Sequence, residues 1–540
     1  MLAPLSQKFP SCSSSACNEA ARLLYEPINR IDWKPPVGGD TKLLLCKEFA
    51  IRADLPRESA DNEMRATRKK GTTTMFNRRL VSHLGAHRLL RGAALPLAML
   101  LVMSTGAQAQ HFTTLYTFVP GSEGGPGPGG GIPLAGVVRD AAGNLYGSTV
   151  AGGLYNPQCT VVNPLYGSCG VVFKVDTFGH ESALYSFAGS PDGGFADQGS
   201  LTLDAAGNLY GTRSDGGDLN ACGGIGCGTV FKLDTEANLT VLHTFEGDSD
   251  GARPSGTMVQ DAAGNLFGTT DYGGPYPGGC GGGGCGVVFK IDASGNFSVL
   301  YAFSGSTDGG VPEGGLVIDS AGDLYGTTSQ AGDVSCTEDG WLPWAGCGVV
   351  FKVDSAGTET VLHTFEGLQA NDGATPKAGL VLDASGDVYG TTYYGGSVNC
   401  VAVRNQTHYR GCGIVFEIDT TGNEHVLYIF ANGPIGYGIG YAPSTRLVLD
   451  GQGNLYGTTE KGGGPQEGTV FELSTAGQYT VLHSFGLGDA PGLALNDGAE
   501  PMGDLILDSA GNLYGTTYAN GDISCYFGDG CGTVFKIEPH

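Results

Sequence analysis

Basic side chains, long apolar runs and tryptophan are all scarce in this chain of 540 residues. It has 29 Lys and Arg against 54 Asp and Glu, a formal net charge of −25 and only 3 Trp. Such a surface repels phosphate backbones and anionic lipid, so we expect no nucleic-acid partner. No apolar run approaches the ~20 residues that a membrane-spanning helix needs, so we also expect no transmembrane segment.

Glycine is abundant, with 93 residues, and many of these glycines belong to one sequence motif that occurs seven times. In each copy an Asp is followed three residues later by Gly, then by Asn or Asp, an aliphatic residue, Tyr or Phe, and Gly. The Asp residues are Asp140, Asp204, Asp261, Asp319, Asp383, Asp450 and Asp508. The period of about 61 residues indicates repeated units that bury their apolar faces against their neighbours.

Each copy contains four short runs with the composition of β-strands. In the fourth copy these are residues 314–318, 324–328, 348–354 and 360–365. The runs are rich in Val, Thr, Tyr and Phe, are bounded by Gly, Asp and Asn, and show no helical periodicity. The pattern predicts an all-β fold made of four-stranded antiparallel blades, which is a β-propeller.

The two ends of the repeat region predict the number of blades. The third strand of the last copy lies close to the C-terminus, and no fourth strand follows it. The missing pattern is at the other end, where residues 112–118 match the fourth strand at 480–485. Letting the N-terminal strand complete the last blade would remove two exposed sheet edges. We therefore predict that residues 110–540 form a seven-bladed β-propeller that is closed by the N-terminal strand.

The first 109 residues lie outside the repeats and resemble an export signal. Four arginines precede the apolar run 93–103, which is followed by the small-residue ending Ala107-Gln108-Ala109. This arrangement predicts a signal peptide at 75–109, cleavage near Ala109 and secretion to the periplasm or the medium. Because such a peptide begins at the start codon, Met75 or Met64 is the expected start. We interpret residues 1–74 as a mis-assigned, disordered upstream extension.

Cysteine usage agrees with export. Three of the 15 cysteines lie upstream, and the other twelve fall as six pairs, each between the second and third strands of one copy; the sixth copy lacks both members. Disulfides fit this pattern in an oxidising compartment, whereas zinc would require more ligands than two thiols per loop. The pairs are Cys159 with Cys169, Cys222 with Cys227, Cys280 with Cys285, Cys336 with Cys347, Cys400 with Cys412, and Cys525 with Cys531.

The recurring motifs GNLYGTT, GCGTVFK and TVLHTF resemble the Gloeobacter/Verrucomicrobia-type (GloVer) tandem repeat of exported bacterial proteins. The resemblance covers residues 111–540. It implies a secreted or surface-anchored protein, with anchoring often through a C-terminal sorting segment. The chain ends in Ile537-Glu538-Pro539-His540 without an apolar tail. We therefore expect a secreted protein and do not extend surface anchoring to it.

Variable loops on one face of the propeller provide the candidate ligand-binding residues. Aromatic rings in these loops can stack on sugar rings while their polar tips donate hydrogen bonds. The alternative is that they pack under the loops and keep them ordered. The candidates are Tyr155, Tyr166, Tyr276, Trp341, Trp344, Tyr394, Tyr409 and Tyr526.

An Asp-Gly pair recurs in five of the loops between blades. Carboxylates around one opening could bind calcium, and no other cofactor is expected. The alternative is that Asp serves as a turn former. The residues are Asp192, Asp250, Asp308, Asp372 and Asp497. His243, His363 and His483 share their strand position with tyrosines, which indicates a position for a planar ring and not a cluster of metal ligands.

Two functions remain open. The first is an exported, non-enzymatic and monomeric repeat protein that binds a glycan, a cell-wall component or an extracellular protein through its loop-rich face. The alternative is a polysaccharide-active hydrolase or lyase, for which Glu338 and Asp339 are the first candidate carboxylates and Asp497 and Glu500 the next. No nucleophile elbow, phosphate loop or zinc-protease motif supports another class of enzyme.

Overall fold

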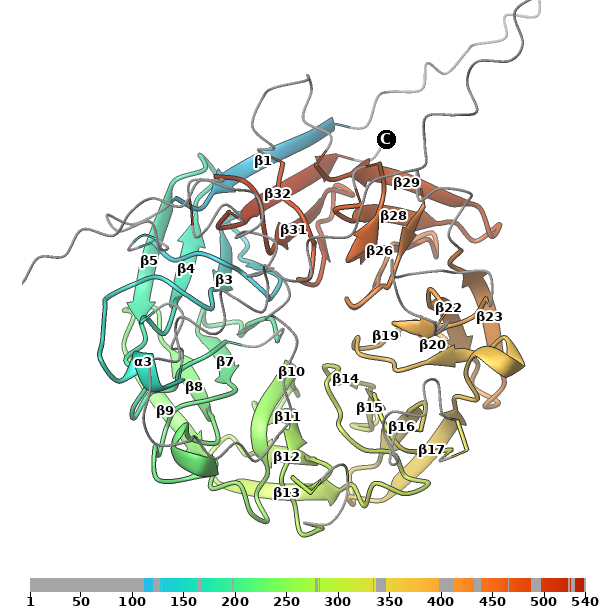
Figure 1. The fold of residues 1–540 in the computed structure, drawn as a ribbon, viewed down its shortest axis with the longest axis horizontal. Coiled ribbons are helices and arrows are strands. Elements are labelled where there is room, and N and C mark those ends of the chain that lie inside the picture. The colour runs from blue at the N-terminus through green and yellow to red at the C-terminus, as the bar shows by residue number, and fades with distance from the viewer. Residues whose placement is uncertain are drawn as a thin grey trace, which may run out of the picture. The chain divides into compact units, whose positions relative to one another are not determined.

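The structure of the chain is a computed structural model. It describes residues 111–119, 127, 129–162, 167–196, 199–276, 280, 282–333, 335–336, 346–397, 411–431, 439–464, 466–486, 497–522, 525 and 530–538. These residues form seven four-stranded antiparallel sheets arranged as a propeller around a central axis (Figure 1). The predicted all-β, seven-bladed fold is therefore confirmed. The predicted signal peptide and upstream extension lie outside the described residues.

In each blade the strands follow one another from the axis to the rim. The first three blades consist of β2 (Val138–Arg139), β3 (Leu145–Ser148), β4 (Val171–Val175) and β5 (Glu181–Ser186); β6 (Thr202–Leu203), β7 (Leu209–Arg213), β8 (Thr229–Leu233) and β9 (Leu239–Thr244); and β10 (Ala252–Gln260), β11 (Leu266–Tyr272), β12 (Val287–Ile291) and β13 (Phe297–Ala302).

The next three blades repeat this order. They consist of β14 (Val317–Ile318), β15 (Leu324–Thr328), β16 (Val349–Val353) and β17 (Glu359–Thr364); β19 (Val381–Leu382), β20 (Val388–Thr392), β22 (Ile414–Ile418) and β23 (Glu424–Ile429); and β25 (Val448–Leu449), β26 (Leu455–Thr459), β28 (Thr469–Leu473) and β29 (Tyr479–Ser484).

The seventh blade combines segments from both ends of the described chain. β30 (Ile506–Leu507), β31 (Leu513–Thr517) and β32 (Thr533–Glu538) form its inner strands, and β1 (His111–Thr117) lies outermost. β1 is antiparallel to β32, with Phe112 opposite Ile537. Figure 1 shows this blue strand beside the red β32.

Short elements occupy the loops between these strands. Two small ladders pair β18 (Gly373–Ala374) with β21 (Tyr394–Gly395) and β24 (Gly440–Tyr441) with β27 (Lys461–Gly462). The helical turns are α3 (Cys159–Val162), η1 (Cys222–Gly224) and η2 (Leu368–Ala370). Within the described ranges, no helix has the length and apolar character needed to cross a membrane.

The repeated Asp residues close the hairpins between the first and second strands. Asp140 accepts hydrogen bonds from the backbone N–H of Asn144 at 2.8 Å and from the hydroxyl of Tyr146 at 3.0 Å. Burial opposes ionisation of Asp140, but these bonds outweigh it and lower the pKa of the carboxyl group. The turn needs a left-handed backbone at Gly143, whose φ is 94°. The recurrence of this Asp therefore reflects its structural role in the hairpin.

The core lies between the blades and is built from two phenylalanines per repeat. Phe365, just after the fourth strand of one blade, packs edge-to-face on Phe416 in the third strand of the next, with 5.2 Å between ring centres. The same contact joins every neighbouring pair of blades, including Phe118 with Phe173 at 5.1 Å. All of these rings are buried. Each blade thus depends on its neighbour for its apolar contacts, as the repeat pattern predicts.

Disulfides cross-link the loops between the second and third strands. Five of the six predicted pairs are bonded, and the sixth, Cys400 with Cys412, includes a residue outside the described ranges. In four of these disulfide loops, the backbone carbonyl of the second cysteine accepts a hydrogen bond from the loop that enters the next blade. The N–H of Val311, a non-glycine residue with a φ of 58°, donates to the carbonyl oxygen of Cys285 at 2.9 Å. These links hold the loops of one face in fixed positions around the axis.

Candidate functional site

The predicted aromatic residues are only partly described. Tyr155 and Tyr276 are 72% and 47% exposed, so their rings are available to a ligand. Tyr394 is partly buried and packs edge-to-face against Tyr393, with 4.7 Å between the ring centres. Several candidates lie outside the described residues: Tyr166, Trp341, Trp344, Tyr409, Tyr526, Glu338 and Asp339.

The five aspartates of the Asp-Gly pairs hold the inter-blade loops to the outer strands. Each accepts a hydrogen bond from the Tyr or His ring of the preceding fourth strand. The pairs are Tyr185 with Asp192 (2.8 Å), His243 with Asp250 (3.0 Å), Tyr301 with Asp308 (3.0 Å), His363 with Asp372 (3.2 Å), and His483 with Asp497 (3.3 Å). These bonds explain why an acidic residue recurs at this position. A calcium site there stays a prediction.

Hydrogen bonds from neighbouring residues of the same loop also hold these carboxylates in position. Asp308 accepts from the backbone N–H of Ser304 at 2.7 Å and from its hydroxyl at 2.7 Å. Burial alone would raise the pKa of Asp308, but the bonds from Ser304 and Tyr301 outweigh it and lower the pKa. Burial, together with the neighbouring carboxylate, raises the pKa of Tyr301 far above its usual range. At neutral pH the pair is thus a phenol that donates to a carboxylate.

A second polar region, which the sequence analysis did not single out, lies at the centre of the ring. The inner loops of blades 3 to 7 line a hollow of about 270 Å³, open space included. Its enclosed part is only about 20 Å³, which is room for about one water molecule, so the hollow is much smaller than ligand sites of roughly 300 to 1,000 Å³. Its lining includes Thr257, Glu313, Lys377, Ser444, Met502 and Asp504, with glycines between them. We call it the central cavity.

A chain of polar contacts begins in the central cavity and continues into blade 5. The ammonium of Lys377 lies 3.7 Å from the carboxylate of Glu313 and 5.1 Å from the ring centre of Tyr393. Glu313 also accepts a hydrogen bond from Ser329 at 3.2 Å. The charge of Glu313 raises the pKa of Lys377 against the opposing effect of burial. Lys377 is therefore a fixed cation at the cavity wall.

The same network extends through blades 6 and 7. The hydroxyl of Tyr393 donates to Glu460 at 2.9 Å, and Lys461 contacts Glu460 at 3.3 Å. Lys461 also forms an ion pair with Glu500. Burial would lower the pKa of Lys461, but the charges of Glu500 and Glu460 outweigh it and raise the pKa. Four neighbouring blades thus share one set of paired charges, which we call the polar network.

Asp504 connects opposite sides of the central cavity. Its carboxylate accepts from the backbone N–H of Arg446 at 2.9 Å and lies 3.6 Å from the guanidinium of that residue. The hydroxyl of Thr257, in the third blade, donates to the same carboxylate at 3.3 Å. A side chain of blade 7 therefore reaches blade 3 across the axis. This contact forms part of the cavity wall.

The residues of the polar network could have been found by comparing the seven copies position by position. Glu313 and Lys377 follow the proline of the inter-blade loop, where other copies have Leu, Ser or Met. Tyr393 and Glu460 follow the second strand, where other copies have Val, Ser, Asp or Tyr. Aromatic and acidic residues in the longest loops give the more obvious local signal. The residues of the polar network instead occupy positions that vary between copies while their neighbours repeat.

The fold and this site define a disulfide-bonded β-propeller whose repeats diverge at the axis. The chain belongs to the Gloeobacter/Verrucomicrobia repeat family, whose profile matches residues 101–342, 168–404 and 345–540. The resemblance of the recurring motifs to this repeat family is therefore confirmed. No protein of curated function matches the chain significantly.

Solved structures share only a distant likeness with the chain. A luciferin-regenerating enzyme has 13% sequence identity and a TM-score of 0.37, over 63% of this chain and 91% of that one. A gluconolactonase from Xanthomonas campestris has 12% identity and a TM-score of 0.33, over 79% and 89%. A protein from Thermus thermophilus, described as a possible glucose dehydrogenase, has 12% identity and a TM-score of 0.34, over 63% and 95%. These values are too low to support an argument about function.

Proposed function

We propose that the protein is exported and binds a glycan at the central cavity, without transforming it. The observation that supports this proposal is the polar network, in which Glu313, Lys377, Tyr393 and Glu460 lie in one line of contacts. Sugar hydroxyls both donate and accept hydrogen bonds. Lysine offers three donors and a carboxylate about four acceptor sites, so the paired groups keep capacity for a ligand.

Aromatic rings on the loops between the second and third strands of blades 1 and 3 add a second mode of recognition. Tyr155 and Tyr276 are well exposed, and an exposed ring can pack on the apolar face of a sugar. The negative charge of the chain disfavours anionic polymers and leaves neutral glycans as the better ligand class. The central cavity is too small to enclose a sugar, so a glycan would lie across its opening and extend over the loops.

The arrangement of charges favours binding over hydrolysis. Glycoside hydrolysis uses two carboxyl groups about 5 to 10 Å apart, one of which must donate a proton. In the polar network Glu313 contacts Lys377, and Glu460 and Glu500 share Lys461. Asp497, which the sequence places near Glu500, bonds instead to His483 of the outer strand. The hydrolase alternative at Glu338 and Asp339 stays a prediction.

A glycan array with the exported protein tests the proposal, followed by calorimetric titration of any glycan that binds. Lys377→Met should weaken binding at least tenfold, because it removes the charge partner of Glu313. Lys352→Met is the matched control, since Lys352 pairs with Asp323 at a hairpin of the fourth blade and does not line the cavity. Absence of glycan binding, or equal loss in both variants, would contradict the proposal.

Export and catalysis need their own measurements. N-terminal sequencing of the secreted protein should begin at Gln110, and an intact residue 75 would contradict the predicted cleavage. Incubation with any bound glycan should release no fragments. Fragments that disappear in the double variant Glu338→Gln and Asp339→Asn would support the hydrolase alternative instead.

A further inference from the structure

The outer strands of neighbouring blades meet at seven equivalent joints. At each joint the Tyr or His ring of one fourth strand lies beside the residue that begins the next fourth strand, and at five joints the ring also bonds to an Asp of the following inter-blade loop. For example, His243 bonds to Asp250 and stacks on Phe297 of the next blade. The residues that the next blade contributes are Glu181, Leu239, Phe297, Glu359, Glu424, Tyr479 and Phe112.

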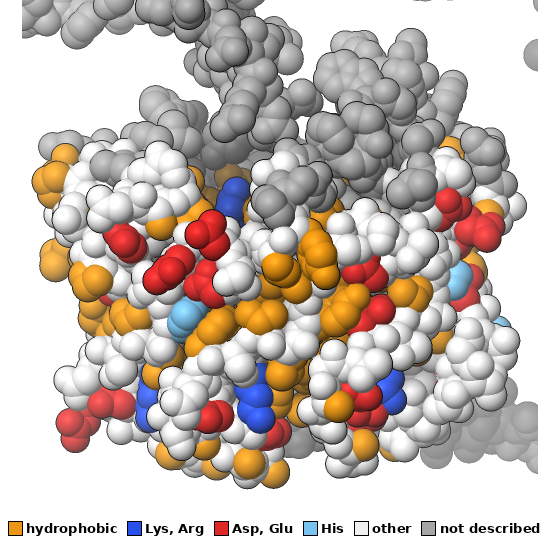
Figure 2. Space-filling view, turned by 90° about the horizontal axis from the view of Figure 1, so that it is seen from below, with side chains coloured by type: hydrophobic (Ala, Val, Ile, Leu, Met, Phe, Trp, Pro, Cys, Tyr) orange, Lys and Arg blue, Asp and Glu red, His pale blue; other side chains and the backbone are white. Residues whose placement is uncertain are grey.

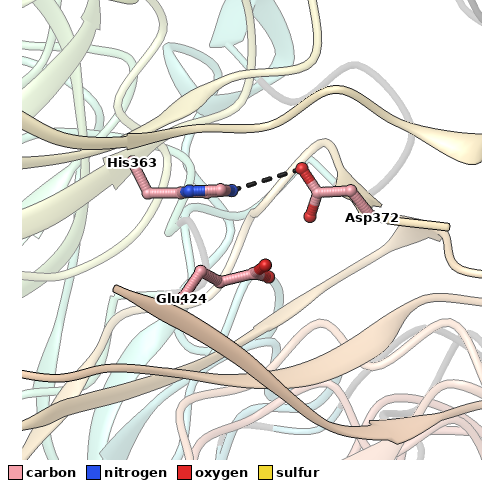
Figure 3. A group of neighbouring side chains, drawn as sticks. All are labelled: His363, Asp372 and Glu424. Atoms are coloured by element: carbon pink, nitrogen blue, oxygen red, sulfur yellow. Dashed lines mark hydrogen bonds and ion pairs between the residues drawn. The ribbon is translucent and has the colours of Figure 1, made fainter. Parts of the chain in front are cut away.

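One of these joints differs in chemistry from all the others. Between β17 and β23 it combines His363, Asp372 and Glu424, and one ligand atom of each lies within 4.8 Å of the other two. Figure 3 shows Glu424 on the strand of blade 5, facing the hydrogen-bonded pair of blade 4. Within the described residues, no other joint brings a His together with two carboxylates.

We propose that His363, Asp372 and Glu424 form a binding site for a divalent transition-metal ion of the zinc type. Imidazole nitrogen and carboxylate oxygen are both zinc ligands, and three protein ligands leave a fourth position for water. The 3.2 Å between His363 Nε2 and Asp372 Oδ2 matches the ligand separation of a tetrahedral site, about 3.3 Å for bonds of about 2.0 Å. A carboxylate oxygen of Glu424 lies within 4.8 Å of both of these ligand atoms.

The surroundings of the three side chains favour a cation. The side chains of His363 and Asp372 are only 20% and 10% exposed. Oε1 of Glu424 is buried and makes no hydrogen bond within the described residues. Glu366 adds a further negative charge near His363. A metal ion would satisfy the buried oxygen and relieve the repulsion between the two carboxylates.

The other joints explain why the combination matters. Tyr301, Asp308 and Glu359 repeat the carboxylates but place a phenol where the imidazole would be, so that joint lacks a nitrogen ligand. His243 and Asp250 repeat the other half, but Phe297 stacks on the imidazole in place of a carboxylate. The chain therefore contains its own matched controls for each ligand.

A metal ion at this joint would connect two blades. His363 belongs to β17, Asp372 precedes β18, and Glu424 begins β23. Since the metal ion would bind the closed ring and not its separated blades, three metal bonds across one joint would stabilise the ring. The site lies at the rim and is separate from the central cavity, so it does not depend on the proposed glycan binding.

Calorimetric titration of the chelator-treated, exported protein with ZnCl2 tests the site, with thermal unfolding as a second readout. We expect one zinc ion that raises Tm, and an affinity at least tenfold lower in Glu424→Gln. His363→Tyr, which copies the joint at Tyr301, should have the same effect. Glu359→Gln should leave zinc binding unchanged. Phe297→Glu should raise the stoichiometry by one, because it completes the ligand set with His243 and Asp250.

Three results would overturn the proposal. They are no zinc binding by the parent protein, equal binding by the parent and Glu424→Gln, and equal loss in Glu424→Gln and Glu359→Gln. A parallel titration with CaCl2 separates this site from an oxygen-only one. Calcium that binds more tightly than zinc and is displaced in Glu424→Gln would also overturn the assignment.

Discussion

The imidazole of His243 lies flat against the phenyl ring of Phe297, with 3.7 Å between ring centres and 5° between the ring planes. His243 belongs to the outer strand of one blade and Phe297 to that of the next. His483 and Phe112 stack in the same way at 3.8 Å, as do Tyr428 and Tyr479 at 4.4 Å. Apolar side chains, with acidic groups and histidines between them, run across the outer wall in Figure 2.

Phe297→Ala should lower the free energy of unfolding by about 2 kcal/mol, because the variant loses the stacked contact and leaves a partly filled space. Urea unfolding followed by tryptophan fluorescence or circular dichroism measures the change. Val299→Ala, on the same strand and 36% exposed, is the control and should cost well under half as much. Equal effects would show that the stack adds nothing beyond ordinary burial.

Glu359 should make stability depend on pH. Burial, with the neighbouring Asp308, raises the pKa of Glu359 to about 7. The raised pKa means that the folded state favours the protonated form, so this stabilisation is complete below about pH 4.5 and is lost as the pH rises through 7. Glu359→Gln should therefore be more stable than the parent at pH 8, by about 1 kcal/mol once solvent screening of the half-exposed group is allowed for.

Unfolding curves at pH 4.5 and pH 8 test this prediction. The difference between parent and Glu359→Gln should appear only at the higher pH. Glu236→Gln, at an exposed hairpin, should change stability by less than about 0.5 kcal/mol at either pH. A parent protein whose stability rises between pH 5 and pH 8 through Glu359 would contradict the assigned direction.

Removal of one disulfide should weaken the fold without abolishing it. Cys222 and Cys227 close a short loop, and the sixth copy of the repeat forms its blade without any cysteine. The double variant Cys222→Ala and Cys227→Ala should therefore fold, with its free energy of unfolding lowered by about 2 kcal/mol. Urea titration with and without reductant measures this, and the difference between parent and variant should shrink once both are reduced.

The glycine that follows Leu-Tyr in the second strand of each blade should not tolerate a side chain. A Cβ on Gly326 would lie 2.6 Å from the ring of Phe351 and 3.0 Å from Leu316, both of which are buried. Gly326→Ala should cost about 1 to 3 kcal/mol, because the core must move to accept the methyl group. Gly451→Ala is the control, since its Cβ would meet nothing within 4 Å. Thermal unfolding should leave the Tm of the control unchanged or slightly raised.

Several features of the fold could be predicted from local sequence because they are local in origin. The repeated motif that begins with Asp specifies a hairpin between the first and second strands. Its hydrogen bonds all lie within about six residues, as the bonds from Asn144 and Tyr146 to Asp140 show. The strand pattern and the count of seven follow from repetition. The disulfide pairs also follow, since both cysteines of each pair belong to one loop.

The candidate sites were less predictable. The aspartates of the Asp-Gly pairs were identified as recurrent, but their partners were not, because the ring that bonds to Asp497 lies 14 residues earlier. The hydrolase candidates depend on long loops with irregular sequence, which no repeat constrains. Histidines judged by their own strand position were set aside as metal ligands, and the carboxylate that completes the set at His363 comes from the next blade.

By itself the sequence determined what each of the seven blades contains. Each has four strands and a hairpin held by Asp, and all but the sixth have a loop that carries a cysteine pair. Tertiary structure alone decided which variable positions meet. Glu313 joins Lys377, Thr257 reaches Asp504 across the axis, and Glu424 faces His363, although the members of each pair lie on different blades and far apart along the chain. The physical reason is that the closed ring fixes neighbours in space by packing phenylalanines, while the residues that give the sites their chemistry contribute little to that packing and leave no periodic signal.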